Sequence, residues 1–365
     1  MDVEFELKTY SGLARSGQLT AGTKIVSTPI VFLGYRLGDK PRAWRSIRIQ
    51  SLMPNAYDLL RNDRRSRDVL EHGIHNFLDY NGLVMMDSGG YYFQKEGKVS
   101  VNVDTVLNLY EKSLPDIGVV LDFPLNPSDP TTNLHRIKKT GENTKVMLQD
   151  ARIPMMPTIH GYTEKDIDYS ARFIDKETQM LALGSQAALL YPFRADKIIK
   201  IMRIVLYVRT KFPNSFLHVF GLGSPRLMPL AFYSGADSVD AKTWLWKAVR
   251  HMIYYNGQIV CIKPDTYSWT PVFDGKGYKC ECPVCSEEGF QGLLGKENWP
   301  KRGLHNAWKY QQEIQNVQTS IKEGTLEDYV RRRLEGTPFM STFRKMKRIV
   351  SDKDLTNHLG SKSLS

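Results

Sequence analysis

The chain has 365 residues, of which 41% are apolar, and it carries a formal net charge of +11. This length allows one large domain or two average domains with a sizeable core. No apolar run approaches the length of a membrane span, and residues 1–4 include two acids rather than the basic start of a signal peptide. We therefore expect a soluble cytoplasmic protein, not a membrane protein.

Apolar runs with the length of buried strands occur at residues 25–34, 83–86, 117–121, 155–159, 180–183, 216–220 and 236–239. Segments with helical spacing lie between them, at residues 103–114, 131–148, 164–174, 196–211, 225–233 and 242–255. This alternation predicts parallel strands joined by helical crossovers. A (β/α)8 barrel is favoured over a doubly wound open sheet, although the eighth unit is not visible.

Polar residues and glycines follow most of these runs directly. They are Asp87-Ser88-Gly89-Gly90-Tyr91, Asp122, His160-Gly161, Gly184, Gly221, Gly223 and Asp240. A strand followed by an ordinary turn explains any one of them. Their recurrence predicts an active site, because the carboxyl ends of parallel strands meet at one end of a barrel.

Three of the four cysteines lie in Cys280-Glu281-Cys282-Pro283-Val284-Cys285. Close-set thiolates suit tetrahedral zinc, whereas a disulfide framework would spread cysteines along a small secreted chain. His305 is the expected fourth ligand, and His251 is a weaker candidate. Four protein ligands leave no open position for water, so we expect Zn2+ to be structural. Cys261 lies in an apolar run and is expected to be a buried thiol.

The positive charge is clustered, and it favours a partner with many phosphates. The clusters are Arg61, Arg64, Arg65 and Arg67; Lys138 and Lys139; Arg331 to Arg333; and Arg344, Lys345, Lys347 and Arg348. A single basic run is usually a solvated surface, but several together make nucleic acid the leading partner. A membrane surface is the weaker alternative, since no basic run has a clear apolar face with tryptophan anchors.

Three features follow one another along the chain. They are the strand-end acids, then the segment Gly235-Ala236-Asp237-Ser238-Val239-Asp240, then the Cys-x-Cys-x-x-Cys…His pattern. In this combination the chain resembles the tRNA-guanine transglycosylase superfamily over roughly residues 25–320. The resemblance implies a zinc-containing (β/α)8 barrel that exchanges guanine in a nucleic acid for a free 7-deazaguanine base. It also implies an N-terminal extension over residues 1–24, a zinc subdomain over about residues 278–310, and a basic helix with a polar, disordered tail over residues 321–365.

The resemblance further implies a role for each matching residue. Asp240 matches the nucleophile and Asp87 the general acid/base, while Asp122 resembles the aspartate that reads the guanine edge. Tyr91 resembles the aromatic residue that stacks on the base, and Cys280, Cys282, Cys285 and His305 match the zinc ligands. The base pocket is expected to include Ser88, Gly89, Gly90, His160, Gly161, Gly184, Gly221 and Gly223. Asp237 is interpreted as a structural acid.

Residues 241–247 depart from the family pattern, because the tRNA enzymes have a cysteine and a Pro-Thr-Arg segment here that hold the anticodon loop. His160-Gly161 also replaces the usual Gln-Gly, and an added RNA-binding domain of the archaeal kind is not expected. The chain therefore looks most similar to the DNA-modifying branch, the DNA 7-deazaguanine transglycosylases (DpdA type) of phages and bacterial genomic islands. That branch implies insertion of a base such as preQ0 into single-stranded or base-flipped DNA, which protects DNA from restriction.

On this interpretation Trp244, Trp246 and residues 91–93 supply stacking or wedging groups, although Trp-x-Trp spacing equally suits a core. A homodimer or a DNA-opening partner remains open, and the cytoplasm would be that of the host if a phage encodes the chain. The alternatives are a tRNA transglycosylase with an unusual anticodon grip, a non-catalytic zinc-stabilised nucleic-acid-binding subunit, and a barrel hydrolase with catalytic zinc.

Overall fold

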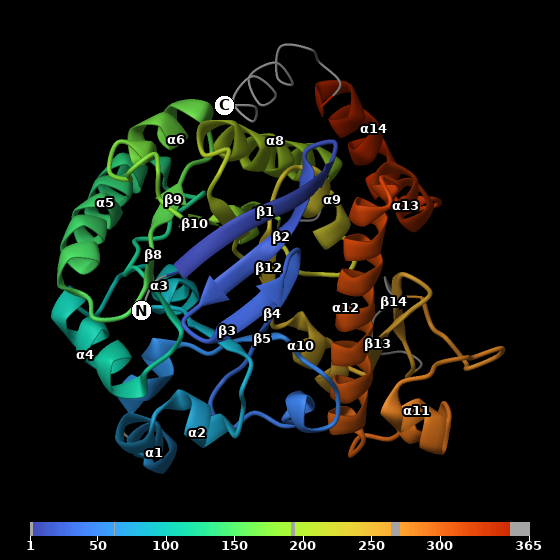
Figure 1. Ribbon diagram of the computed structural model, residues 1–365. Helices are drawn as coiled ribbons and strands as arrows, with labels where there is room; N and C mark the ends of the chain where they lie inside the picture. Colours follow the sequence, from blue (N-terminus) through green and yellow to red (C-terminus); the bar gives the residue numbers. More distant parts are fainter. Residues whose placement is uncertain (1–2, 62, 191–193, 264–270, 351–365) are drawn as a thin grey trace.

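The computed structural model describes residues 3–61, 63–190, 194–263 and 271–350 (Figure 1). Its centre is a parallel sheet in the order β8-β7-β6-β5-β4-β12-β11-β10-β9. The strands are β4 (Ile30–Gly34), β5 (Ser51–Met53), β6 (Leu83–Met86), β7 (Ile117–Val119), β8 (Met155–Met156), β9 (Thr158–His160), β10 (Met180–Gly184), β11 (Phe216–Val219) and β12 (Ser238–Ala241). β8 pairs with β7 and β9 pairs with β10, on either side of Pro157. Residues 155–160 thus close an eight-position barrel, which confirms the predicted (β/α)8 fold.

Helices surround the barrel and return the chain from the carboxyl end of one strand to the start of the next (Figure 1). They are α1 (Arg64–His72), α2 (Ile74–Leu78), α3 (Gly90–Glu96), α4 (Val103–Ser113), α5 (Asn133–Asp150), α6 (Glu164–Ala171), α7 (Gln186–Leu189), α8 (Ala195–Lys211), α9 (Met228–Tyr233) and α10 (Thr243–Val249). Side-chain caps fix three of the starts: Asp63 accepts from the backbone N–H of Ser66, Asn102 accepts from that of Thr105, and Thr163 forms a capping box with Asp166.

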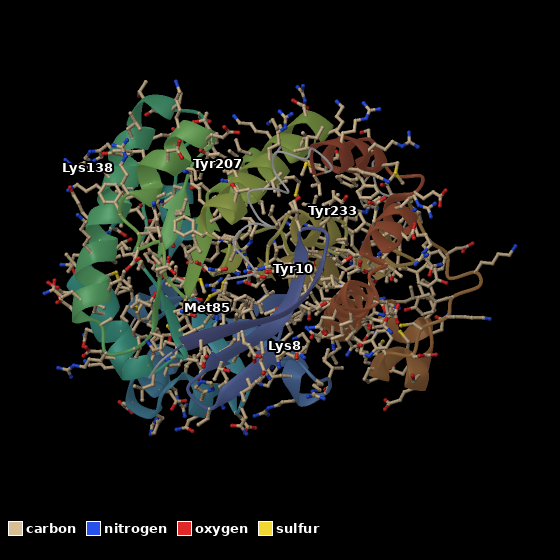
Figure 2. The ribbon with its side chains drawn as sticks, turned by 45° about the horizontal axis from the view of Figure 1, so that its top comes forward. Lys8, Tyr10, Met85, Lys138, Tyr207 and Tyr233 are labelled. Carbon is tan, nitrogen blue, oxygen red and sulfur yellow. The ribbon has the colours of Figure 1, made fainter. Side chains whose placement is uncertain are left out.

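A three-stranded antiparallel sheet covers the amino-terminal end of the barrel. It comprises β1 (Val3–Ser11), β2 (Ala14–Ala21) and β3 (Lys24–Ser27). Phe5, Leu19 and Val26 from this sheet pack with Phe32 and Met85 of the barrel strands. Figure 2 labels Lys8 and Tyr10 on the sheet and Met85 on the barrel behind it. This apolar plug closes one end of the barrel and leaves the carboxyl end for a site.

Two predicted elements differ in the structure, and one strand was not predicted. The expected strand at residues 25–34 is two strands, because β3 belongs to the antiparallel sheet and only β4 to the barrel. The barrel strand that sequence patterning missed is β5, whose three residues are too short to show a periodicity. The expected helix at residues 242–255 ends at Val249. Residues 252–255 form β13, which pairs with β14 (Gln258–Cys261) across an Asn256-Gly257 turn.

The remaining helices lie on one side of the barrel (Figure 1). They are α11 (Pro283–Glu288), α12 (Trp299–Lys322), α13 (Leu326–Leu334) and α14 (Phe339–Val350). The basic carboxyl-terminal segment therefore contains two helices, and α14 packs against α8. The expected polar tail, residues 351–365, lies outside the described residues. Among the described residues no helix is long and apolar enough to cross a membrane.

Candidate functional site

Three aspartates meet at the carboxyl end of the barrel. Asp87 directly follows β6, Asp122 lies three residues after β7, and Asp240 lies within β12. Burial, and after it the charges of Asp122 and Asp240, raise the pKa of Asp87 to about 8, against backbone hydrogen bonds that lower it. Like charges destabilise an ionised carboxylate between them, so Asp87 holds a proton near neutral pH.

Asp87 is positioned by the segment that follows β5. Its backbone N–H donates to the carbonyl of Pro54 at 3.0 Å, and its carbonyl accepts from Ala56 at 2.8 Å. The side-chain amide of Asn55 donates to Oδ2 of Asp87 at 2.5 Å. Sequence patterning missed Asn55 because it missed β5. The signal available was the apolar run Leu52-Met53 before Pro54-Asn55, which is very short.

Asp122 is buried and lies against His160 at the end of β9. Nε2 of His160 is 3.1 Å from Oδ2 of Asp122, and the other ring nitrogen, Nδ1, is 2.8 Å from Oγ of Ser185. The hydroxyl of Ser88 is 3.4 Å from Oδ1 of Asp122. The structure thus brings together Asp122, His160 and Ser88, which the sequence placed in one pocket.

Asp240 has a sparse set of partners. Its Oδ1 accepts a hydrogen bond from the backbone N–H of Gly221 at 2.6 Å. Nε2 of His218, a residue of β11, is 3.5 Å from the same oxygen, and Nδ1 of His218 is 2.8 Å from Oγ of Ser238. His218 was not predicted, because it lies inside an apolar run where a histidine is usually a core residue.

Glycines let the strand ends approach one another closely. A Cβ on Gly90 would lie 2.9 Å from Oδ1 of Asp122, and a Cβ on Gly184 would lie 2.4 Å from Cε1 of His160. Gly89, Gly161, Gly221 and Gly223 occupy the corresponding turns after β6, β9 and β11. The buried amide of Gln186, another unpredicted residue, donates to the carbonyls of Gly161 and Gly184 at 2.9 and 3.1 Å. A larger residue at Gly90 or Gly184 would displace the groups of the site.

The aromatic residues expected to stack or wedge divide into two groups. Trp244 is fully buried, and its indole N–H donates to the carbonyl of Gly34 at 3.1 Å. Phe93 is also in the core, so it offers no face for stacking, and for Trp244 the core alternative is the one that the structure confirms. Trp246 is 54% exposed, with the guanidinium of Arg250 3.3 Å from its ring centroid. The side chain of Tyr91, which α3 carries, lies outside the described residues.

Asp237 lies just before β12, at the opposite end of the strand from the site. Arg15 donates to its two carboxylate oxygens at 2.9 and 2.7 Å, and Arg209 donates at 2.6 Å. The backbone N–H of Leu217 adds a fourth hydrogen bond at 2.7 Å. All three charged side chains are buried. Asp237 therefore has the structural role that the sequence predicted.

Cys280, Cys282, Cys285 and His305 converge between the β13–β14 hairpin, α11 and α12. Their ligand atoms all lie within 4.8 Å of one another. Nδ1 of His305 is 3.4, 3.5 and 3.6 Å from the three sulfurs. A tetrahedral zinc with Zn–N and Zn–S bonds of about 2.1 and 2.3 Å requires a separation of about 3.6 Å. The donor set and its geometry fit a tetrahedral metal ion.

The ring of His305 is oriented by its second nitrogen. Nε2 donates to the backbone carbonyl of Tyr254 at 2.9 Å, which leaves Nδ1 for a metal. The neighbouring Asn306 accepts from the N–H of Tyr254 at 3.0 Å and donates to the carbonyl of Trp244 at 3.0 Å. Asn306 thus ties the β13–β14 hairpin to α10, the helix that follows Asp240.

The fold and the site together define a class of protein. Its members are parallel (β/α)8 barrels with acids at the carboxyl end of the barrel and a Cys3His cluster. Residues 10–338 match the family model described as "Queuine tRNA-ribosyltransferase", and the chain belongs to this family, TGT.

Three curated relatives of the chain are each named tRNA-guanine(15) transglycosylase. The protein of Pyrococcus furiosus is 28% identical over 92% of this chain and 57% of its own length. That of Thermococcus kodakarensis is 27% identical over 93% and 58%, and that of Methanopyrus kandleri is 24% identical over 89% and 71%. The chain thus spans little more than half the length of the first two relatives.

Proposed function

We propose that this chain exchanges guanine in a nucleic acid for a free 7-deazaguanine base, through a covalent intermediate on Asp240. The observation that carries the proposal is the contrast within the site. The pKa of Asp87 is raised to about 8 by burial and by two neighbouring carboxylates. Asp240 lies opposite with one backbone hydrogen bond to its carboxylate. A protonated acid beside an available carboxylate suits a double displacement at a sugar carbon.

In the first step an oxygen of Asp240 forms a bond to C1′, and the C1′–N9 bond breaks. Guanine leaves with the bonding electron pair and takes up a proton, for which Asp87 is the donor. In the second step the incoming base attacks C1′, gives its proton to Asp87 and releases Asp240. Two inversions restore the original anomeric configuration.

Asp122 supplies recognition of the base in this proposal. An ionised carboxylate only accepts hydrogen bonds, so it suits the N1–H and the exocyclic amine of guanine. His160, 3.1 Å away, and Ser88 hold this carboxylate in one orientation. A base without those two donors would leave a buried acceptor unpaired, which discriminates strongly against it.

The comparisons support tRNA as the nucleic acid better than DNA, since the relatives are named for tRNA. DNA is the second candidate, and it rests on residues 241–247, which lack the Pro-Thr-Arg segment expected of a tRNA enzyme. Here Trp244 is built into the core instead. The missing Pro-Thr-Arg segment is the only ground for proposing a DNA-modifying phage enzyme that protects DNA from restriction. Either substrate is met in the cytoplasm.

The test is incorporation of labelled preQ0 into unmodified tRNA and into DNA, each with the wild type and Asp240→Ala. Label in tRNA that disappears with Asp240→Ala is the expected result, while label in DNA alone would establish the second candidate. Label in neither nucleic acid, from folded protein that still binds both, would favour the non-catalytic binding subunit and contradict the proposal.

We propose that the Cys3His cluster holds a structural zinc ion, which would cross-link the segment of residues 280–285 to α12 and take no part in the exchange. Elemental analysis of the purified protein should give about one zinc per chain. Cys282→Ser should lose the metal and lower the unfolding temperature, whereas Cys261→Ser, at a buried thiol outside the cluster, should keep it. Retention of one zinc by Cys282→Ser would contradict this assignment.

A further inference from the structure

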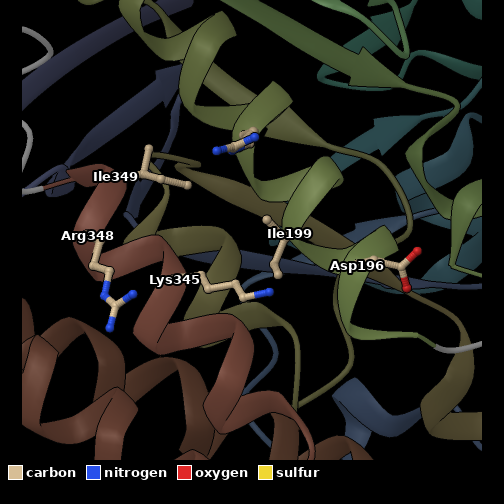
Figure 3. A pocket seen from close by; sticks show the side chains of 6 residues that line it. Asp196, Ile199, Lys345, Arg348 and Ile349 are labelled. Atoms are coloured by element: carbon tan, nitrogen blue, oxygen red, sulfur yellow. The ribbon is translucent and has the colours of Figure 1, made fainter.

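An open groove on the outside of the barrel lies between α6, α8 and α14. Two adjoining hollows, of about 410 and 530 Å3, share Asp196, Ile199 and Arg203 of α8. We call this surface the α8 groove. Figure 3 shows Ile199 of α8 and Ile349 of α14 in it, with the side chain of Lys345 extending from α14 toward α8.

The α8 groove begins at the catalytic end of the barrel. α6 starts three residues after His160-Gly161, and its first turn contributes Glu164 and Lys165 to the groove. α8 likewise starts at the end of the barrel where β10 finishes at Gly184, and it returns along the outside. Asp196 and Arg203 are seven residues apart on this helix, a rise of about 10 Å. The groove therefore leads away from the site along the barrel wall.

Positive charge dominates the lining of the α8 groove. The exposed cations are Lys165, Lys200, Arg203, Lys345 and Arg348. Two carboxylates oppose them, and one of these, Asp196, already pairs with Arg194 at 3.0 Å. Within the part of the chain that the structure describes, Lys165, Lys200, Arg203 and Lys345 form no ion pair with a carboxylate.

Two basic clusters elsewhere on the surface are partly neutralised by carboxylates. Lys138 and Lys139 both pair with Glu142, and Arg331 pairs with Asp328. Arg333 is held by Glu313 at 2.6 Å. Part of the positive charge of these clusters is therefore already paired with carboxylates of the same chain. The α8 groove differs, because most of its cations remain available to an external anion.

We propose that the α8 groove binds the phosphodiester backbone of the nucleic acid whose guanine enters the site. Lysine and arginine neutralise phosphates without reading sequence, and an open groove with cations on its rim and isoleucines in its floor suits a flexible strand. This inference rests on the proposed function, which it deepens by giving the substrate a path across the surface. tRNA and DNA offer the same phosphate chemistry.

The test is the salt dependence of binding to a guanine-containing single-stranded DNA and to a tRNA transcript. The triple variant Lys200→Gln, Arg203→Gln, Lys345→Gln should weaken binding at least about tenfold and lower the slope of log K against log salt by about 2 for a single strand. Its kcat at saturating nucleic acid and its affinity for free preQ0 should not change. Unchanged affinity and slope would overturn the proposal.

A matched control removes the same charges from the opposite end of the barrel. Lys112, Arg152 and Lys176 are exposed and precede the barrel strands β7, β8 and β10. The variant Lys112→Gln, Arg152→Gln, Lys176→Gln should keep most of the affinity, and an equal loss would mean that only net charge matters, against the proposal. If the first triple variant unfolds, the single change Lys345→Gln on the outer helix should still lower the slope by about 0.7.

These measurements separate this inference from the proposed function. Groove-dependent binding by a protein that exchanges no base would support the groove and contradict the exchange. Base exchange that is unchanged in the groove variants would support the proposed function and contradict the role of the groove. Vesicles containing phosphatidylserine serve as a second anionic probe, and groove-dependent binding to vesicles without binding to nucleic acid would overturn the assignment.

Discussion

Asp237 and Asp240 lie three residues apart at opposite ends of β12, and their surroundings differ completely. Asp237 receives three hydrogen bonds from two buried arginines and one from a backbone N–H. Asp240 receives one, from Gly221. A carboxylate with all its acceptor sites filled has little capacity for a further bond, whereas a sparsely bonded carboxylate is available to react. The comparison therefore distinguishes the amino-terminal end of the barrel, where Asp237 stabilises the fold, from the carboxyl end, where we propose that Asp240 reacts.

The largest effect on activity is expected for Asp240→Ala. Loss of the proposed nucleophile should reduce base exchange by at least about 10⁴-fold. Because Asp240 has few partners, the free energy of unfolding should change by less than about 1 kcal/mol. Exchange assays and denaturant unfolding of the same preparation test both parts. A variant that loses stability instead of activity would remove the distinction between the two aspartates.

Asp237→Ala should have the largest effect on stability. Burial and the charge of Arg15 lower the pKa of Arg209 to about 9, against the attraction of Asp237. Removing Asp237 leaves two buried guanidinium groups unpaired, which should cost about 3–5 kcal/mol. Denaturant unfolding measures this cost. A change below about 1 kcal/mol, within the usual range for surface substitutions, would contradict the structural role.

Asp87→Asn should reduce exchange by about 10²- to 10⁴-fold, since an amide cannot supply or take up the proton. The wild-type rate should fall above about pH 8 as Asp87 ionises. A flat profile between pH 7 and pH 9 in the wild type would exclude Asp87 as the acid.

The same substitution should make stability less dependent on pH. The folded pKa of Asp87 is raised from 3.8 to about 8, so the folded protein binds a proton that the unfolded chain releases. The stability linked to that proton is present below about pH 4 and is lost as the pH rises toward 8. Asp87→Asn should therefore gain stability relative to the wild type across this window. Equal pH dependence in both proteins would argue against a protonated Asp87 in the folded protein.

The smallest effect is expected for Asn55→Ala. Its amide holds Oδ2 of Asp87, so its loss should reduce kcat about tenfold while KM changes little. Asn76→Ala serves as a control, because the amide of Asn76 donates to a backbone carbonyl, that of His72, at an exposed position. Equal kcat and KM values for the two variants would mean that Asn55 does not position Asp87.

The sequence by itself determined the barrel, the end of the barrel that carries the polar groups, and the cysteine–histidine cluster. In a parallel barrel every strand delivers its carboxyl end to the same face, so the order of residues along the chain already implies that Asp87, Asp122 and His160 meet. The cluster was visible because three ligands lie within six residues.

Only the tertiary structure decided how the charged and aromatic residues divide their roles. Arg15 contacts Asp237 across 222 residues of sequence, and no local pattern encodes such a pair. The burial of Trp244 and exposure of Trp246 depend on packing against Gly34 and α12. The same holds for Asn55, which follows a three-residue strand, and for the cations of the α8 groove. Local spacing along the chain determines which residues share an end of the barrel. Long-range contacts determine which of those residues already have hydrogen-bonding or ionic partners within the fold.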